Sequence, residues 1–176
     1  MIDFSRNHFD LFGLAQTFCC DPAALDRAYR RLQSDVHPDR HAGASDAQKR
    51  LAQQSSAQVN EAYRTLRSPV QRAQYLLRLH GIDPVSPSDT ALPLDFLERQ
   101  LERREQAAEA QAEGDVGRLA DLLADARAES LALEGVLGKV LDGDHDYAAA
   151  RMRVRELTFL SKLADDIDAM LTAIDS

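Results

Sequence analysis

The residues with the most specific chemistry in this sequence are His37-Pro38-Asp39-Arg40, four consecutive residues between two amphipathic helical patterns. Pro38 disfavours helical geometry at the residue before it, so it ends the first helix and stiffens the turn. The turn therefore holds the His37 imidazole and the Asp39 carboxylate in a fixed relation. A carboxylate held in this way can enter one specific salt bridge with a partner at a reduced entropic cost. Taken alone, the same tripeptide also fits an ordinary turn that ends a helix.

The helix before this turn is predicted to have one apolar face and one basic face. Arg27, Arg30 and Arg31 fall on the same side of the helix. Cationic side chains beside a rigid aspartate are suited to an acidic surface on another protein. The opposite side carries apolar residues at helical spacing, which would form the inner face of a hairpin: Leu25, Ala28, Tyr29, Leu32 and Val36.

Four helices are predicted in the first 81 residues, because each has recognisable start or stop signals. A short helix runs from about residue 8 to Gly13, and three longer helices begin near residues 22, 45 and 68. The signals are the N-cap Asp21 with Pro22 in the first turn, the capping box of Ser45 and Gln48, a second box of Ser68 and Gln71, and the stop at His80-Gly81.

A proline-rich break at residues 81–89 separates this region from a second one, because a helix cannot continue through Pro84 and Pro87. Three longer helices are expected after it, at about 94–113, 115–141 and 144–174. Their apolar residues repeat at alternating spacings of three and four, which is typical of a helix bundle. The sequence therefore predicts an all-α protein: an N-terminal domain built on a helical hairpin (1–81), a linker (82–93) and a C-terminal three-helix antiparallel bundle (94–176).

A second candidate surface lies on the helix predicted from residue 94. Leu97, Leu101 and Ala108 share one stripe of this helix, and a neighbouring stripe consists of glutamates. An apolar stripe with carboxylates along one side suits a partner that presents apolar and basic residues. Periodicity alone leaves open a second interpretation, in which the leucines are core and the glutamates a solvated face. The glutamates of this stripe are Glu98, Glu102, Glu105 and Glu109.

On the last helix, Phe159 points away from the main apolar seam. It is therefore either a packing residue or part of such a surface.

The first half of the chain resembles a J-domain, the module of DnaJ-type co-chaperones. The segments that carry the resemblance are 28–32, His37-Pro38-Asp39-Arg40 and 60–66. It implies that a DnaK-type ATPase chaperone binds here and that its ATP hydrolysis is stimulated. Two residues depart from the family pattern, because Asp35 stands where a basic residue is common and Val36 where tyrosine is usual. The contact residues implied are His37, Pro38, Asp39 and Arg40, with the basic face of Arg27, Arg30 and Arg31.

The second half resembles the HscB-type co-chaperones of iron–sulfur cluster assembly, through segments 71–81, 96–105 and 154–163. This resemblance implies that the bundle binds the scaffold protein IscU and that the chain delivers IscU to the specialised chaperone HscA. The nearest alternative is a J-domain protein that serves a general DnaK with a different client. The scaffold-binding residues implied by the resemblance are Leu97, Glu98, Leu101, Glu102, Glu105, Glu109 and Phe159.

Charge and hydropathy argue against two other classes of partner. Residues 1–80 carry 11 basic and 8 acidic side chains, whereas residues 81–176 carry 10 and 21, and the net charge is −8. A strongly acidic half disfavours nucleic acid, because phosphate binding needs concentrated lysine and arginine. No apolar run approaches the roughly 18 residues that a membrane span requires. We therefore expect a cytoplasmic protein whose partners are other proteins.

The sequence carries no pattern typical of an enzyme or of a metal centre. It has no phosphate-binding glycine loop, no nucleophile elbow and no paired-carboxylate site, and its acidic residues are spread along helix faces as in solvated surfaces. Cys19 and Cys20 are adjacent, which is not the spacing of a zinc or redox pair. We therefore expect free thiols, no cofactor, no metal and no intrinsic catalysis. A thiol- or metal-binding protein is the remaining alternative.

Overall fold

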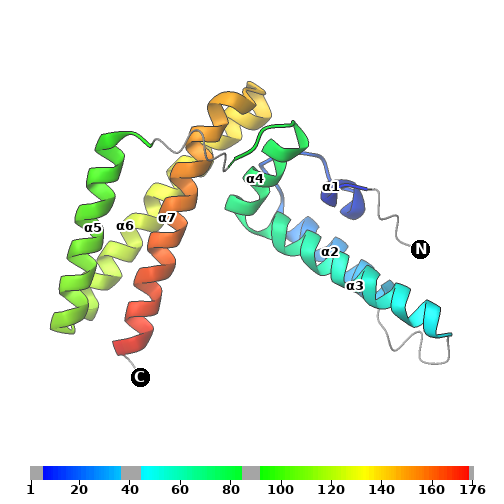
Figure 1. Ribbon diagram of the computed structural model, residues 1–176, viewed down its shortest axis with the longest axis horizontal. Coiled ribbons are helices and arrows are strands. Elements are labelled where there is room, and N and C mark those ends of the chain that lie inside the picture. Colours follow the sequence, from blue (N-terminus) through cyan, green and yellow to red (C-terminus); the bar gives the residue numbers. More distant parts are fainter. Residues whose placement is uncertain (1–5, 37–44, 85–91, 175–176) are drawn as a thin grey trace. The chain divides into compact units, whose positions relative to one another are not determined.

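The computed structural model describes residues 6–36, 45–84 and 92–174, and every regular element in these ranges is a helix (Figure 1). The prediction of an all-α fold is therefore confirmed. The chain divides into two compact units, Met1–Leu76 and Leu77–Ser176, with the division inside helix α4. Each unit has its own set of fully buried apolar side chains.

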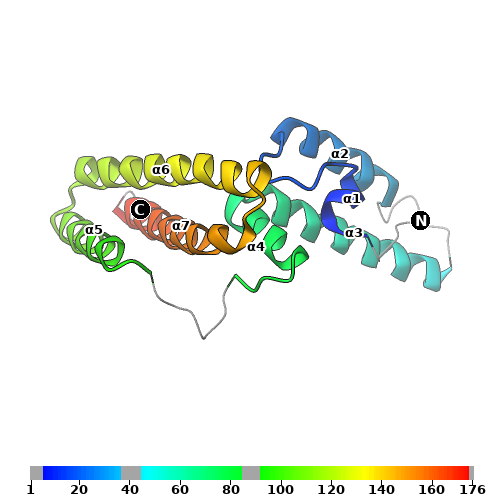
Figure 2. The ribbon, with the colours of Figure 1, turned by 90° about the horizontal axis from the view of Figure 1, so that it is seen from above.

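The first unit is built on a helical hairpin. Its arms are α2 (Pro22–Val36) and α3 (Asp46–Arg67), which pack along each other, while α1 (His8–Phe12) contacts both and α4 (Pro69–Leu79) follows α3 (Figure 2). The predicted helix starts are confirmed. The amide of Ala23 donates to Asp21 Oδ1 at 2.9 Å, Ser45 and Gln48 form the reciprocal capping box, and the amide of Gln71 donates to Ser68 Oγ at 3.4 Å.

Side chains from both arms fix the register of the hairpin. The rings of Tyr29 and Tyr63 are stacked with their centroids 4.1 Å apart. The Tyr29 hydroxyl donates to Asn60 Oδ1 at 2.9 Å, and the Gln33 amide donates to the same Asn60 oxygen and to the Tyr29 oxygen. Because the inner face of α2 is held in this way, the direction of its outer face is fixed as well.

A buried arginine joins the two ends of this unit. Arg72 on α4 is 9% exposed, and its Nε donates to the carbonyl oxygen of Phe18 at 2.7 Å while its NH1 donates to that of Leu66 at 2.6 Å. The guanidinium also lies 5.0 Å from the centroid of the Phe18 ring. Leu66 is in the last turn of α3, where carbonyl groups lack helical partners. Arg72 therefore ties the segment between α1 and α2 to the corner between α3 and α4.

The second unit contains three long helices, which lie side by side in both views (Figures 1 and 2). They are α5 (Leu94–Glu113), α6 (Val116–Gly138) and α7 (Tyr147–Ile174). Gly114 adopts a φ of 69°, a left-handed conformation that ends α5 and turns the chain into α6. The predicted three-helix bundle is confirmed. Its main core cluster joins small residues of α5 to leucines and an isoleucine of the other helices: Ala107, Ala110, Leu119, Leu123, Ala126, Leu163 and Ile167.

The connection between α6 and α7 differs from the prediction. The α-helical pattern was expected to reach about Leu141, but α6 ends at Gly138 and the chain continues as a π-helical turn, η2 (Lys139–Gly143). The last helix was expected from about Asp144, but it begins at Tyr147. His145 has a φ of 53°, which no α-helix accommodates, and the amide of Ala149 donates to Asp146 Oδ1 at 2.9 Å as a cap.

Candidate functional surfaces

The arginines predicted to form a basic face are on the outside of the hairpin. Arg27, Arg30 and Arg31 belong to α2 and are all exposed on its outer side, whereas Leu25 and Ala28 on its inner side are 1% and 8% exposed. Arg27 pairs with Asp21 at 3.7 Å, and both side chains are more than half exposed, so this ion pair is weak. The turn residues His37, Pro38, Asp39 and Arg40 lie outside the described residues, and their role stays a prediction.

The acidic residue of α2 beside these arginines, Asp26, contacts side chains of α3. The Tyr63 hydroxyl donates to Asp26 Oδ1 at 2.9 Å, and this hydrogen bond raises the pKa of Tyr63. Arg67 Nε also lies 3.8 Å from the same carboxylate oxygen. The Asp26 carboxylate is therefore directed toward α3.

On α5, the leucines of the predicted patch are exposed. The residues of α5 that are buried are Phe96, Gln100, Ala107 and Ala110. Leu97 and Leu101 are 37% and 60% exposed, so the interpretation that assigns them to the core is wrong. Other residues supply the core contacts of α5, and the helix turns these two leucines toward solvent. Exposed large apolar side chains of this kind are typical of an interaction surface.

The glutamates beside these leucines are exposed as well: Glu98, Glu102, Glu105 and Glu109. Glu109 accepts a hydrogen bond from Arg118 NH2 at 2.7 Å, and Glu102 accepts one from the Gln106 amide at 3.3 Å. We use the term α5 surface for Leu97, Leu101 and these four glutamates. Its charge is strongly negative, and its apolar part faces the same side of the helix as Ala108.

Phe159 on α7 lies next to this surface. Its ring meets Phe96 of α5 edge to face, with centroids 5.9 Å apart, and the guanidinium carbon of Arg104 lies 4.9 Å from its centroid. Arg104 follows Leu101 by one helical turn, so Phe159 is placed beside the apolar stripe of α5. Phe159 itself is partly buried. The structure thus brings the aromatic residue predicted from the sequence to the helix that carries the predicted leucines.

Comparisons with known proteins match both units of the chain. The DnaJ domain model matches residues 7–75, and the model described as the HSCB C-terminal oligomerisation domain matches residues 92–168. Over 171 residues, the chain is 47% identical to the co-chaperone protein HscB homolog of Ralstonia nicotianae, with 97% of each chain covered. The chain belongs to the HscB family of co-chaperones. An HscB homolog of Burkholderia multivorans is 46% identical over the full length of both chains.

Solved structures of HscB-family proteins share this fold. The chaperone HscB from Vibrio cholerae matches with a TM-score of 0.83 and 33% identity, covering 96% of this chain and 99% of that one. The human co-chaperone protein HscB matches with a TM-score of 0.86 and 28% identity, covering 96% of this chain and 83% of that one. The expected family, the J-domain and the all-α architecture are therefore confirmed.

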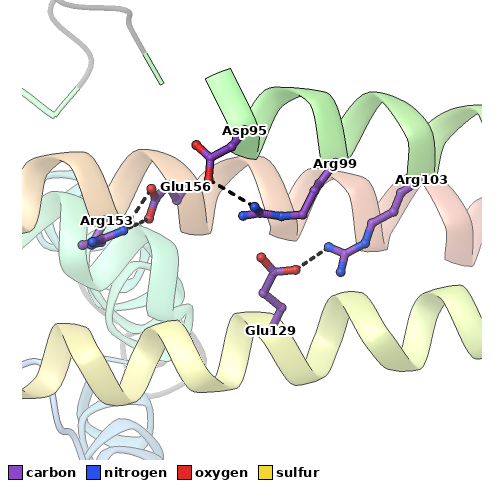
Figure 3. A network of polar contacts seen from close by, with 6 residues as sticks. All are labelled: Asp95, Arg99, Arg103, Glu129, Arg153 and Glu156. Carbon is purple, nitrogen blue, oxygen red and sulfur yellow. Dashed lines mark hydrogen bonds and ion pairs between the residues drawn. The ribbon is translucent and has the colours of Figure 1, made fainter. Parts of the chain in front are cut away.

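One acidic residue of this HscB-family chain is not on a solvated face, contrary to the prediction. Glu156 on α7 is 5% exposed, and both its oxygens accept hydrogen bonds from Arg153 NH1, at 3.1 and 2.8 Å (Figure 3). It lines a cleft of about 230 Å³ between α5, α6 and α7. Arg99 and Glu129 also line this cleft, and each belongs to a further ion pair, Arg99 with Asp95 at 3.2 Å and Glu129 with Arg103 (Figure 3).

One of these ion pairs joins two helices. Arg103 of α5 pairs with Glu129 of α6, whereas Asp95 and Arg99 both belong to α5 and Arg153 and Glu156 both belong to α7 (Figure 3). Nε2 of the fully buried Gln100 has no hydrogen-bond partner. The half of α5 that carries Leu97 and Leu101 is therefore attached to α6 by the Arg103–Glu129 ion pair and to α7 by the contact of the buried Phe96 with Phe159.

The two cysteines, Cys19 and Cys20, lie in the segment between α1 and α2. Cys19 is exposed and Cys20 is partly buried, neither belongs to a disulfide in the described part of the chain, and burial raises the pKa of the Cys20 thiol. In the described ranges, no three His, Cys, Asp or Glu side chains are grouped so that they could hold a metal ion. No helix among the described residues has the length and apolar character needed to cross a membrane.

Proposed function

We propose that this HscB-family chain joins two proteins: a DnaK-type ATPase chaperone, which we take to be HscA, and the iron–sulfur scaffold protein IscU as its client. The first unit would bind the chaperone through His37, Pro38, Asp39 and the basic face of α2. The second would bind IscU through the α5 surface and Phe159. The energy would come from ATP hydrolysis by the partner, so the chain itself would act by binding and not as an enzyme.

The observation that carries this proposal is the exposure of Leu97 and Leu101 on a helix whose core residues are others. Burial of an exposed leucine in an interface releases apolar surface from water, which is a main source of binding free energy. The surrounding glutamates restrict the partner to one with complementary basic groups. A scaffold protein with apolar and basic residues at its docking site would satisfy both conditions.

For the chaperone, the support comes from charge and from family membership. The basic face of α2 lies on the outside of the hairpin, and the neighbouring Asp26 carboxylate contacts Tyr63 and Arg67 of α3. A DnaK-type chaperone with an acidic docking surface would be attracted to such a face. An adaptor of this kind stimulates hydrolysis if it binds the hydrolysis-competent state of the chaperone more tightly than the resting state.

The test is the affinity of purified chain for purified IscU, measured by isothermal titration calorimetry. The double variant Leu97→Ala/Phe159→Ala should weaken binding by about 2–4 kcal/mol, with about 1–2 kcal/mol from each anchor. Leu131→Ala is the matched control, because Leu131 is 69% exposed but lies on α6. Unchanged binding by the double variant would remove the α5 surface from the proposal, and no binding of IscU by the native chain would favour a different client.

A further inference from the structure

Arg104 and Phe159 form a contact that the proposed function does not require. The guanidinium carbon lies 4.9 Å from the centroid of the ring, while Phe96, which is 4% exposed, meets the ring from α5 with an interplanar angle of 79°. Phe159 therefore has one buried aromatic neighbour and one cationic neighbour. The cation covers part of an aromatic side chain that would otherwise be available to a client.

A second contact holds the guanidinium in this place. Arg104 NH2 lies 3.6 Å from Asp166 Oδ2, and the two side chains are 42% and 46% exposed. Asp166 comes seven residues after Phe159 on α7, so the two lie on the same stripe of the helix, two turns apart. The aspartate thus tethers Arg104 beside the ring, although both charged groups remain in contact with water.

We propose that Arg104 is a reversible cover on Phe159, tethered by Asp166, and that the client displaces it on binding. This inference rests on the proposed function, since it describes how the client surface is regulated. A client side chain can gain full apolar contact with the ring only after the guanidinium leaves it. Cation–π contacts and ion pairs at exposed sites are individually weak, so the cover opens readily.

Such a cover makes client binding selective. An unrelated protein whose apolar surface contacts only Phe159 must displace the ion-paired Arg104, and it gains no binding free energy from other contacts. A client that also contacts Leu97, Leu101 and the glutamates offsets this cost, and its basic groups repel Arg104 as they approach. The apparent dissociation constant for the client equals the intrinsic one divided by the fraction of molecules in which the cover is open. Removal of the tether should therefore tighten client binding.

The position of the cover can be measured without any client. The sequence contains no tryptophan, so Phe159→Trp introduces a single fluorophore whose larger ring retains the cation–π contact. In the Phe159→Trp chain, we expect Asp166→Asn or Arg104→Gln to shift the emission to longer wavelength and to increase quenching by acrylamide. Asp168→Asn is the matched control, because Asp168 lies on the same helix as Asp166 and the substitution breaks its exposed ion pair with Arg127 of α6, at 3.0 Å.

The effect on binding is measured by calorimetry with IscU on chains that retain Phe159. Asp166→Asn and Arg104→Gln should each bind IscU roughly three- to tenfold more tightly, whereas Asp168→Asn should not. In a Phe159→Ala background, the same two substitutions should have no effect, because the side chain that the cover protects is absent. The two variants remove opposite charges, so a general electrostatic effect on client binding would move them in opposite directions.

The outcomes separate this inference from the proposed function. If Phe159→Ala binds IscU like the native chain, the proposed client surface is wrong at this residue, whatever the fluorescence shows. If Phe159→Ala weakens binding but Asp166→Asn and Arg104→Gln leave it unchanged or weaken it, the client surface stands and the cover is overturned. Acrylamide quenching of the introduced tryptophan that neither substitution changes would also overturn the cover.

Discussion

The two candidate surfaces differ in the kind of side chain that each presents. The outer face of α2 presents arginines, which are long, mobile and hydrated, while the large apolar residues described for the hairpin are turned inward or partly covered. The α5 surface presents leucines at 37% and 60% exposure among carboxylates. Exposed arginines attract an acidic partner over a distance that salt screens, whereas exposed leucines bind by excluding water, which salt does not weaken.

This difference suggests two kinds of association within one chain. A partner attracted mainly by charge associates quickly and dissociates easily, as suits a chaperone that must release the adaptor in each cycle. A partner held by apolar anchors is retained until the surface is competed for. The opposite signs of the two surfaces also prevent either partner from occupying both sites.

The largest effect is expected at the predicted turn. Asp39→Ala should abolish the stimulation of HscA ATPase activity, because the proposal assigns the Asp39 carboxylate to the specific salt bridge with the chaperone. Binding of IscU should be unchanged in the same variant, and the far-ultraviolet circular dichroism should match that of the native chain. The measurement is steady-state ATP hydrolysis by HscA. Stimulation equal to that of the native chain would show that the turn assignment is wrong.

The second-largest effect is expected at Arg72, a buried residue of the unit that carries the basic face. Arg72→Met should destabilise the first unit by about 2–4 kcal/mol, because buried hydrogen bonds from a charged group to the Phe18 and Leu66 carbonyls are lost. Hydrogen exchange should show the loss in α2 and α3 but not in α6 and α7. Arg50→Met, at an exposed position of α3, is the control. Equal protection in the Arg72 and Arg50 variants would contradict the role given to the buried guanidinium.

A smaller effect should separate the two surfaces by ionic strength. Arg30→Ala/Arg31→Ala should weaken HscA binding roughly three- to tenfold at low salt, and the difference should shrink as salt is added. The control Arg118→Ala/Arg127→Ala removes the same charge from α6 and should leave HscA binding nearly unchanged. IscU binding to the native chain should depend much less on salt. A salt dependence that is equal for both partners would remove the distinction between the surfaces.

The smallest effect is a dependence of stability on pH in the first unit. His8 stacks on Tyr75 with centroids 4.2 Å apart, and burial lowers its pKa below the usual 6.5 while Glu61 partly opposes this. As the pH is lowered, the His8 imidazole is therefore protonated at a higher pH in the unfolded chain than in the folded chain. The contribution of His8 to stability is complete above pH 6.5 and falls as the pH is lowered through that value, until the folded-state pKa is passed.

Urea unfolding of the native chain and of His8→Gln between about pH 5 and 7.5 measures this contribution. The difference in unfolding free energy between the two chains should change with pH in the direction that favours the variant at acid pH. Exchange protection in α1 and α4 should follow the same trend in the native chain, since His8 lies against Tyr75 of α4. A constant difference across this pH range would contradict a neutral, buried His8.

Much of this fold could be predicted because its signals are local. Asp21 with Pro22, the Ser45 and Gln48 box and Gly114 each mark a helix end through side-chain or backbone chemistry that involves only neighbouring residues. The π-helical turn after Gly138 could not be predicted in this way. No residue type demands it, and it depends on how the ends of α6 and α7 meet.

The candidate surfaces were predictable to different degrees for the same reason. The stripe of Leu97 and Leu101 follows from periodicity, but periodicity gives only relative positions on a helix and not which stripe faces the core. In the structure, the buried stripe contains Phe96 and Gln100. The contact of Phe159 with Arg104 joins α7 to α5, and the cleft that Glu156 lines is formed by α5, α6 and α7. Both depend on helices far apart in the sequence, so no local pattern indicates them.

The most direct test of the central claim is a titration of HscA ATPase activity with this chain and IscU, separately and together. If one chain holds the chaperone at one surface and the client at another, the rate with both should exceed the sum of the separate stimulations. The excess should vanish with Asp39→Ala and also with Leu97→Ala/Phe159→Ala, although these residues belong to different units. A rate with both proteins that equals the sum of the separate effects would contradict the account.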